Sequence, residues 1–377
     1  MKLVLSEEQL MLNEAAEGYL RQHAGPEKLR ALRDEGKLRG FDPSVWAEMA
    51  EMGWTGVLTP EDQGGVGLGH VEAGVIAEAM GQNLSAAPFL STAVMGAIAL
   101  TRFGGPANAD WPAKMAAGEA ILAIALDEGR RHAPTQVATT ASRKGNGFRI
   151  TGNKTFVQDG AEADALIVSA RTSGAEDDES GITLFLVPAD TPGVDRTPLR
   201  MIDASGAARI TLDVEVDADA VIGEMDEGGV PLAQILASGR AVAAAELSGA
   251  AQGALTHSIA YLKERSQFGQ VIGRFQALQH RAAHLYAEVQ MAKSLALKSL
   301  FALDANAQDA TLLTHAAKAK AGQVAQLAAK EAIQLHGGIG MTDAHDIGFY
   351  LKRVQVADTR YGDANYHADA FARTRGY

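Results

Sequence analysis

Apolar residues recur at helical spacing through the first third of the chain. The segment "SEEQLMLNEAAEGYLRQHA" opens on Ser6 as a cap, has glutamates in its first turn and repeats apolar residues every three or four positions. A second helix is predicted in "FDPSVWAEMAEMGW", entered through Pro43. A third is predicted after the glycine-rich start of "TPEDQGGVGLGHVEAGVIAEAMG". The pattern predicts a helical N-terminal domain over residues 1–118.

The hydrophobic period changes to two in the middle of the chain. Four segments rich in β-branched residues are separated by Gly, Asp and Pro turns: "GFRITGNKTFV", "ADALIVSART", "GITLFLVPAD" and "ARITLDVEV". This alternation predicts a small β-domain over residues 119–225.

Long helices are predicted again toward the C-terminus. Pro231 is the last proline in the sequence, and Ala- and Leu-rich segments follow it at 231–264, 274–304, 308–336 and 343–360. Helices of this length packed side by side form a bundle. We therefore predict a C-terminal four-helix bundle over residues 226–377, and an α+β multidomain fold in the order helices, sheet, helices.

Composition narrows the class of protein. A chain of 377 residues is too long for one compact core. The net charge of −12 excludes nucleic acid as an expected partner, because phosphate contacts need clustered Lys and Arg. The absence of cysteine excludes disulfides, thiolate chemistry and Cys-based metal sites. Glu7 and Glu8 stand where a signal peptide would be apolar, and no segment has the length of a membrane span, so a cytoplasmic protein is predicted.

Two short stretches suit ligand binding but have plainer interpretations. In "ERSQFGQVIGRFQALQHRAAHLY" (264–286), Arg265 and Phe268 suit a phosphate clamp and a stacking contact, but spacing alone favours a charged helix end with a core phenylalanine. In "QLHGGIGMTD" (334–343), three glycines allow close approach of a ligand or simply end a helix. A helix rather than a strand precedes them, so a dinucleotide-binding fingerprint is rejected. His280 and His284 have the spacing of a metal pair but no third ligand, so no metal is predicted.

Four stretches together resemble the acyl-CoA dehydrogenase family, in that family's order and spacing: "TPEDQGGVGLG", "ITGNKTFVQDGAEADALIVSART", "RSQFGQVIGRFQALQH" and "QLHGGIG". The resemblance implies FAD, acyl-CoA thioester substrates, an electron-transfer flavoprotein as oxidant and a dimer or tetramer. It also implies α,β-dehydrogenation, in which a carboxylate removes the α-proton and the β-hydrogen leaves as hydride to the flavin.

One set of residues matches the family positions that reach the flavin of the neighbouring subunit: Arg265, Phe268, Gln276, Gln334, Gly337 and Gly338. The set that holds the subunit's own flavin departs from the pattern. The family's Thr-Glu-Pro and Gly-Ser-Asp loop is represented by "LDEGRRHAPTQ", without the proline or the Gly-Ser-Asp. Phe156 replaces the usual Trp, and Gln158 replaces the hydroxyl residue near flavin N5. The turn at 130–132 (Arg-Arg-His) is either another phosphate site or an exposed basic turn.

Neither family position for the catalytic glutamate holds a carboxylate. The C-terminal position falls on Gly362, or on Tyr361 if no gap is allowed, and the second position falls on Gly239, directly before the expected substrate contact Arg240. Two other carboxylates are candidates for the base.

Asp363 is displaced by one residue and alternatively caps a helix. Glu246 lies in a small-residue helix, where burial would raise its pKa, and alternatively pairs with a neighbouring Arg or a helix end. Both roles remain open for each carboxylate.

The sequence therefore predicts a subunit of an FAD-dependent acyl-CoA dehydrogenase that introduces a 2,3 double bond. Two alternatives are open: a self-sufficient homo-oligomer, or the degenerate half of an α2β2 assembly with a homologous subunit, as in bacterial breakdown of sterol side chains. A flavoprotein oxidase or monooxygenase on the same scaffold and a non-catalytic structural subunit are the other candidates. The sequence does not identify the acyl chain.

Overall fold

The computed structural model describes residues 3–178 and 180–377 and confirms the predicted fold class. Helices come first, a small sheet follows and long helices end the chain. The chain divides into two compact units. The sheet unit comprises residues 32–69 and 86–239, and the bundle unit comprises the described residues up to Ala31, residues 70–85 and residues 240–377.

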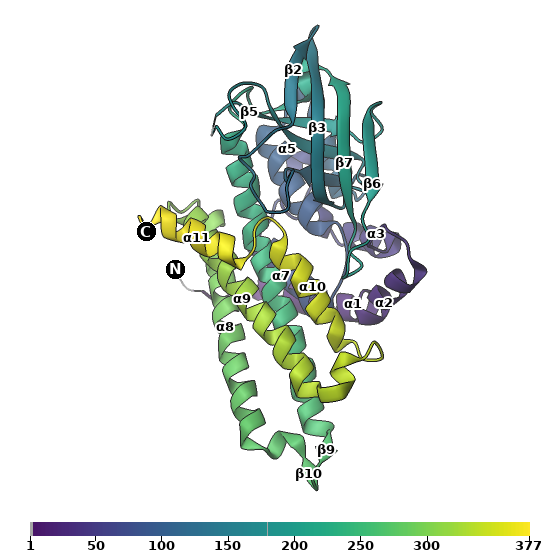
Figure 1. Cartoon of the computed structure of the whole chain (residues 1–377), viewed down its shortest axis with the longest axis vertical. Coiled ribbons are helices and arrows are strands. Elements are labelled where there is room, and N and C mark those ends of the chain that lie inside the picture. The colour runs from purple at the N-terminus through teal and green to yellow at the C-terminus, as the bar shows by residue number, and fades with distance from the viewer. Residues whose placement is uncertain (1–2, 179) are drawn as a thin grey trace. The chain divides into compact units, whose positions relative to one another are not determined.

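One eight-stranded sheet organises the sheet unit, with strand order β6-β7-β3-β2-β4-β5-β8 and β1 paired with β4 in parallel. Its strands are β1 (Leu122–Ala125), β2 (Thr140–Lys144), β3 (Gly147–Gln158), β4 (Ala165–Arg171), β5 (Ile182–Pro188), β6 (Val194–Pro198), β7 (Ala207–Val216) and β8 (Val221–Ile222). The long strands β3 and β7 lie side by side (Figure 1), with Ile150 opposite Val214. In β7 buried and exposed residues alternate, whereas every residue of β4 is buried, so β4 belongs to the core.

Short helices complete the sheet unit: α3 (Pro43–Glu51), α5 (Ala97–Phe103), α6 (Trp111–Ala116) and a π-helical segment at Phe89–Gly96. Asp42 begins α3, because its carboxylate accepts the backbone N–H of Ser44 and Pro43 occupies the first helical position. The π-helical segment is tied to the sheet through Thr92, whose hydroxyl accepts the backbone N–H of Leu122 at the start of β1.

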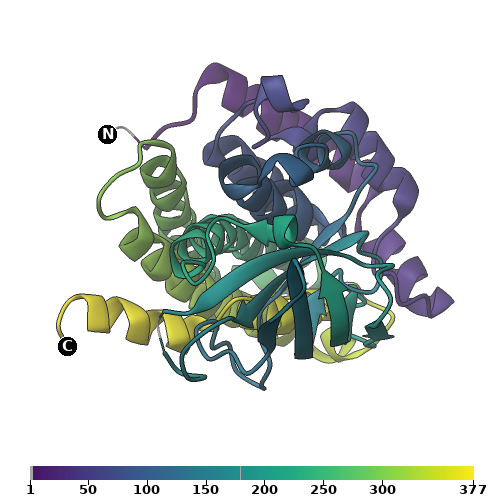
Figure 2. The same cartoon turned by 90° about the horizontal axis from the view of Figure 1, so that it is seen from above.

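Long helices form the bundle unit: α1 (Glu7–His23), α4 (His70–Asn83), α8 (Gln276–Asp304), α9 (Ala310–His336), α10 (Ile347–Thr359), α11 (Ala364–Thr374) and the part of α7 (Gly229–Glu264) from Arg240 onward. Helix α2 (Pro26–Glu35) has residues in both units. Helices α7, α8 and α9 run side by side in Figure 1 and are seen nearly end-on in Figure 2.

Small residues let α7 approach its neighbours closely. A Cβ added to Gly249 would lie 1.9 Å from the carbonyl oxygen of Glu78 in α4. A Cβ at Gly253 would lie 2.6 Å from the ring of Tyr350 in α10. Glycine at both positions is therefore a packing requirement, since even a methyl group would push the helices apart.

Candidate functional site

A cavity of about 550 Å³ lies in the bundle unit, where α7, α8 and α9 end or begin. Five of the six residues matched to the neighbour's flavin line it: Arg265, Phe268, Gln334, Gly337 and Gly338. Gln276, the first residue of α8, is not among the described lining residues, although Phe275 and Leu278 on either side of it are. Two segments far apart in the sequence thus meet at one concave surface.

A tight hairpin presents the aromatic side of this cavity. Strands β9 (Ser266–Gln267) and β10 (Gln270–Val271) pair across Phe268 and Gly269, which both have positive φ, 54° and 79°. Positive φ at both central residues defines a type I′ turn, a geometry in which an aromatic residue is strained. Phe268 is 89% exposed at this turn. The backbone therefore holds a large apolar ring in water, where a partner or ligand would cover it.

Glycines form another part of the cavity wall. Gly337 ends α9 with φ of 63°, and its N–H donates to the carbonyl of Gln334. A Cβ added to Gly337 or Gly338 would meet nothing within 4 Å, so both backbones border open space. A ligand can approach this wall to backbone distance.

The cavity contains one guanidinium that is paired with a carboxylate and one that is not. Arg281 donates to Glu331 at 2.7 Å. Arg265 has no ion pair with a carboxylate among residues 3–178 and 180–377. The imidazole of His336 stacks on Tyr261 with a centroid separation of 4.5 Å, and burial lowers the pKa of His336, so this ring is neutral at pH 7. Arg265 is therefore the available cation, and a guanidinium suits a phosphate oxygen pair.

A side chain at either of the family's two glutamate positions would displace neighbouring side chains. Gly362 has φ of 102°, and a Cβ there would lie 2.5 Å from Cδ1 of Tyr366 and 2.8 Å from Nε2 of His367. A Cβ at Gly239 would lie 2.7 Å from Sδ of Met95, within the sheet unit. Contacts below 3.0 Å require a shift of the neighbouring atoms.

Both candidate carboxylates have structural partners. Asp363 caps α11, accepting the backbone N–H of Tyr366 at 2.8 Å. Glu246 is buried at 7% exposure, and its Oε2 lies 2.6 Å from Nη2 of Arg360. The other oxygen of Glu246 lies 3.9 Å from a guanidinium nitrogen of Arg353. Asp363 thus caps a helix and Glu246 belongs to an ion pair. These are the structural roles that the sequence left open beside that of a catalytic base.

Four basic residues, three of them buried, lie around the turn at residues 361–363. Arg240 is 5% exposed, its Nη1 lies 3.2 Å from Nε2 of His315, and burial lowers its pKa to about 10. Nδ1 of His315 lies 2.9 Å from Nδ1 of His367. Lys318 is fully buried and donates to the carbonyl of Gly362 at 3.0 Å. Sequence reasoning missed all but Arg240, because lysine and histidine in an Ala-rich helix give no sign of which face is buried.

Replacing Lys318 by methionine tests the electrostatics of this turn. Burial lowers the pKa of Lys318 from 10.5 to about 8. Between pH 8 and 10.5 the unfolded chain keeps a proton that the folded chain has lost, so this group makes the free energy of unfolding rise with pH, by at most about 1.4 kcal/mol per pH unit. We expect denaturant unfolding to show that the free energy of unfolding of wild type, relative to that of Lys318→Met, is larger at pH 9.5 than at pH 7.5. Lys330→Met, at an exposed position of α9, should give no such change, and a pH-independent difference for Lys318→Met would refute the assignment.

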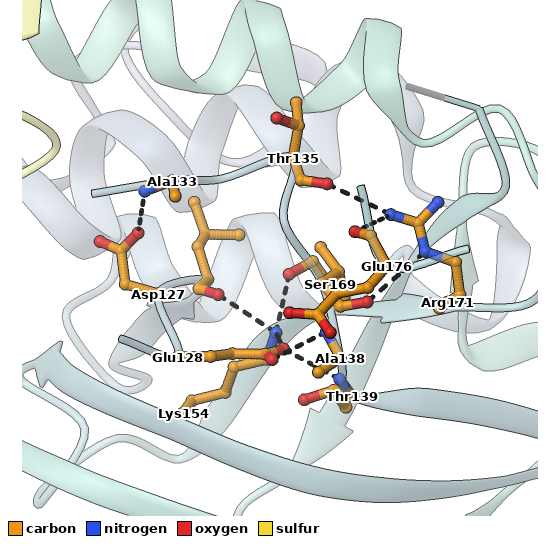
Figure 3. Close-up of polar contacts among 12 residues, drawn as sticks. Asp127, Glu128, Ala133, Thr135, Ala138, Thr139, Lys154, Ser169, Arg171 and Glu176 are labelled. Atoms are coloured by element: carbon orange, nitrogen blue, oxygen red, sulfur yellow. Dashed lines mark hydrogen bonds and ion pairs between the residues drawn. The ribbon is translucent and has the colours of Figure 1, made fainter. Parts of the chain in front are cut away.

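The loop that represents the family's own-flavin segment is closed on itself (Figure 3). The carboxylate of Asp127 lies 3.0 Å from Nδ1 of His132 and accepts the N–H of Ala133 at 3.1 Å. Arg171 donates to carbonyls along the same loop and the next one, at Thr135 (3.2 Å), Glu176 (2.9 Å), Asp178 (3.1 Å) and Ser180 (2.6 Å). These bonds fix the loop without a ligand.

A buried ion pair anchors the base of this loop (Figure 3). Lys154 is 0% exposed, and its amine donates to Glu128 at 2.7 Å, to the hydroxyl of Ser169 at 3.0 Å and to the carbonyl of Leu126 at 3.1 Å. Burial lowers the pKa of Lys154. Burial alone raises the pKa of Glu128, but the charge and hydrogen bond of Lys154 outweigh it and the net shift is downward. Glu128 also accepts the N–H groups of Ala138 and Thr139.

The other residues matched to the subunit's own flavin site are Phe156, Gln158, Arg130 and Arg131. Phe156 is 58% exposed with φ of 49°, at the register shift between Lys154 and Val157. The buried Oε1 of Gln158 accepts no hydrogen bond from the described residues. Arg130 and Arg131 are exposed and line a separate cavity of about 690 Å³, which also contains Glu128 and Glu176.

Other sequence features carry no site. His280 and His284 are exposed, and the described part of the chain contains no cluster of three or more His, Asp or Glu side chains placed to hold a metal. Within that same part, no helix combines the length and apolarity that a bilayer span needs.

Known proteins resemble this chain over nearly its whole length. Models of the acyl-CoA dehydrogenase N-terminal, middle and C-terminal domains match residues 6–119, 125–213 and 227–375. "Probable acyl-CoA dehydrogenase YngJ" of Bacillus subtilis is 30% identical over 383 residues, covering 99% of each chain. Two solved structures cover nearly all of the chain. A chain of the "ChsE4-ChsE5 complex from Mycobacterium tuberculosis" has TM-score 0.90, 27% identity and coverage of 100% and 99%. A chain from a variant of the "Tcur3481-Tcur3483 steroid ACAD" has TM-score 0.88, 30% identity and coverage of 98% of each chain.

The helical, sheet and bundle regions, with the cavity at 265–338, define a flavoprotein oxidoreductase scaffold. The chain belongs to the acyl-CoA dehydrogenase family, and the resemblance seen in the sequence is confirmed.

Proposed function

We propose that this chain is the subunit of an FAD-dependent acyl-CoA dehydrogenase that completes the flavin site of a homologous partner and has no catalytic base of its own. The observation that carries the proposal is a contrast inside the bundle unit. The cavity around Arg265 is open and has an uncompensated cation, whereas the space beyond Gly362 is filled by Tyr366 and His367. The reaction is α,β-dehydrogenation of an acyl-CoA thioester, with an electron-transfer flavoprotein as oxidant.

The residues of the cavity suit FAD. Arg265 would bind a phosphate oxygen, Phe268 would stack on a ring of the cofactor, and the Gly337–Gly338 backbone would lie against it. Gln276 would complete the set from the first turn of α8. When bound, FAD supplies the hydride acceptor. This chain's residues bind and orient the cofactor, and the partner's carboxylate takes the α-proton.

The assignments of Asp363 and Glu246 support a base-free subunit. A base must reach the substrate's α-carbon and be free to accept a proton. Asp363 already accepts a backbone N–H at the start of α11, and Glu246 is held within 2.6 Å of Arg360. Removing either group would disturb a helix cap or a buried ion pair before any chemistry.

Relatives support a heteromeric assembly and a bulky acyl group. The matched ChsE4–ChsE5 structure is a complex of two differently named chains, and the Tcur3481–Tcur3483 structure is described as a steroid enzyme. We propose an α2β2 assembly with a homologous subunit acting on a fatty or sterol-derived acyl-CoA. The predicted cytoplasmic location stays a prediction.

Isosteric variants in the assembled enzyme test which subunit supplies the catalytic base. We expect Asp363→Asn with Glu246→Gln in this chain to leave kcat within a factor of about three, because neither group acts as base. Glu→Gln at the partner's catalytic glutamate should lower kcat about 10²- to 10⁴-fold. Flavin content and melting temperature serve as controls for assembly. A collapse of kcat in the variant of this chain, with flavin content unchanged, would show that it contains a base.

A further inference from the structure

The space beyond Gly362 is filled by an oriented imidazole. Nε2 of His367 lies 2.8 Å from the point where a Cβ at residue 362 would stand, and His367 is 0% exposed. A glutamate side chain would begin in close contact with this ring and with Cδ1 of Tyr366, which lies 2.5 Å from the same point. His367 comes from α11 and is held by His315 of α9, so two helices fix its position.

Hydrogen-bond chemistry fixes which nitrogens carry hydrogen. The guanidinium of Arg240 is only a donor, so Nε2 of His315, 3.2 Å away, accepts and carries no hydrogen. Neutral His315 therefore has its hydrogen on Nδ1. The 2.9 Å contact between the two Nδ1 atoms needs one donor and one acceptor, so His315 donates and His367 accepts. Neutral His367 then carries its hydrogen on Nε2, the nitrogen next to Gly362.

Arg240 is the fixed charge of this relay. Arg240 is buried and charged, and among the described residues no carboxylate pairs with it. A second positive charge beside it in a low-dielectric interior would be costly. The relay thus has one direction, from Arg240 through His315 to His367.

The backbone of the turn is held by a buried lysine. Lys318 donates to the carbonyls of Asp358 at 2.8 Å and Gly362 at 3.0 Å. Gly362 has φ of 102°, a conformation that side-chain-bearing residues rarely adopt. The turn is therefore built for glycine by its backbone and by its surroundings.

We propose that His367, oriented through His315 by Arg240, is a positioning residue that fills the place of the absent carboxylate and presents an N–H donor there. The inference rests on the proposed function, in which this subunit has no base. It also gives a reason for that absence, because an imidazole nitrogen that carries hydrogen cannot accept the α-proton. Converting Gly362 to glutamate would not by itself restore a base, because His367 and Tyr366 occupy the side-chain space.

The tautomers are directly observable in the full-length chain. Long-range ¹H–¹⁵N correlation of ¹⁵N-histidine-labelled protein distinguishes protonated from unprotonated ring nitrogens, and single His→Gln variants assign the signals among the ten histidines. We expect His315 protonated on Nδ1 and His367 on Nε2. An unprotonated Nε2 in His367 would overturn the proposal. This measurement needs neither flavin nor activity, so its result is independent of whether the proposed function holds.

Two substitutions at His315 separate orientation from simple packing. Glutamine keeps an acceptor for Arg240 and a donor for His367, so His315→Gln should preserve the Nε2–H form of His367. Glutamate offers only acceptors, so His315→Glu should move the hydrogen of His367 to Nδ1. A purely structural role would leave the His367 tautomer unchanged in both variants, and that result would contradict the proposal.

Steric occupation is tested with a matched glycine. Gly362→Ala and Gly145→Ala both place Ala at positive φ, but an added Cβ at Gly145 meets nothing within 4 Å. We expect the melting temperature to fall several degrees further for Gly362→Ala, and this excess to shrink in a His367→Ala background. Equal shifts for the two glycines, or an excess unchanged by His367→Ala, would show that the imidazole does not fill the space.

Discussion

We expect replacement of Arg265 by methionine to weaken FAD binding in the proposed assembled enzyme while leaving this chain folded. The side chain lies at the cavity shared by Phe268 and the Gly337–Gly338 turn and has no carboxylate partner within the described residues. A charge-assisted hydrogen bond to a phosphate contributes about 1.5–3 kcal/mol. Its loss corresponds to roughly 10- to 100-fold weaker cofactor binding. Turnover falls in parallel and recovers at high added FAD.

The control for this experiment lies in the same connection between helices. Arg274 is exposed, in the segment that follows Arg265, and is not a lining residue of the cavity. Arg274→Met removes the same charge, so general electrostatic attraction predicts equal effects for both variants. Arg265→Lys keeps the charge but loses the fork geometry and should recover only part of the affinity. Titration of apoprotein with FAD measures all three, and equal affinities would remove Arg265 from the site.

Among the proposed substitutions, we expect Lys154→Met to cause the largest loss of stability. The amine is 0% exposed and pairs with Glu128 at 2.7 Å (Figure 3). Removing the amine leaves Glu128, whose side chain is 16% exposed, without its cation. Breaking a fully buried pair costs about 3–5 kcal/mol, and the partial exposure of Glu128 places this loss at the lower end. The loop at 126–139 loses its anchor at the same time, because Glu128 also fixes the N–H groups of Ala138 and Thr139.

Lys144 provides the comparison for Lys154. It pairs with Glu215 on the exposed surface of the same sheet, at half exposure. An exposed pair contributes at most about 1 kcal/mol. Chemical denaturation should therefore separate the two variants clearly. The double variant Lys154→Met with Glu128→Gln should recover part of the loss, because the uncompensated charge is removed. Similar midpoints for Lys144→Met and Lys154→Met would contradict the buried-pair interpretation.

Periodicity located the main elements and missed those without a pattern. The four predicted strand segments correspond to β3, β4, β5 and β7, and the four long C-terminal segments to α7, α8, α9 and α10. Strand β1 escaped because all four of its residues are buried and show no alternation. Strand β6 escaped because it is mostly exposed at the sheet edge. Helix α11 has only 11 residues, after a turn that gives little helical signal.

The sequence likewise marked one part of the candidate site and missed the other. Arg265 and Phe268 lie in a hairpin, and Gly337 and Gly338 in a helix-ending turn, so local motifs marked both parts of the cavity. The network around Gly362 was invisible because it joins residues far apart in the sequence. Glu246 and Arg360 are 114 positions apart, and His315 and His367 are 52 apart. No local pattern specifies which buried polar groups will meet across a bundle.

The most direct test of the account is the visible spectrum of this chain, expressed and purified alone, with flavin counted per subunit. We expect a flavin-poor protein that becomes yellow and active when co-purified with a homologous acyl-CoA dehydrogenase subunit. A protein that carries one flavin per chain by itself, and bleaches anaerobically on addition of an acyl-CoA, would contradict it. That result would mean that the sheet unit holds its own cofactor and that a base exists within this chain.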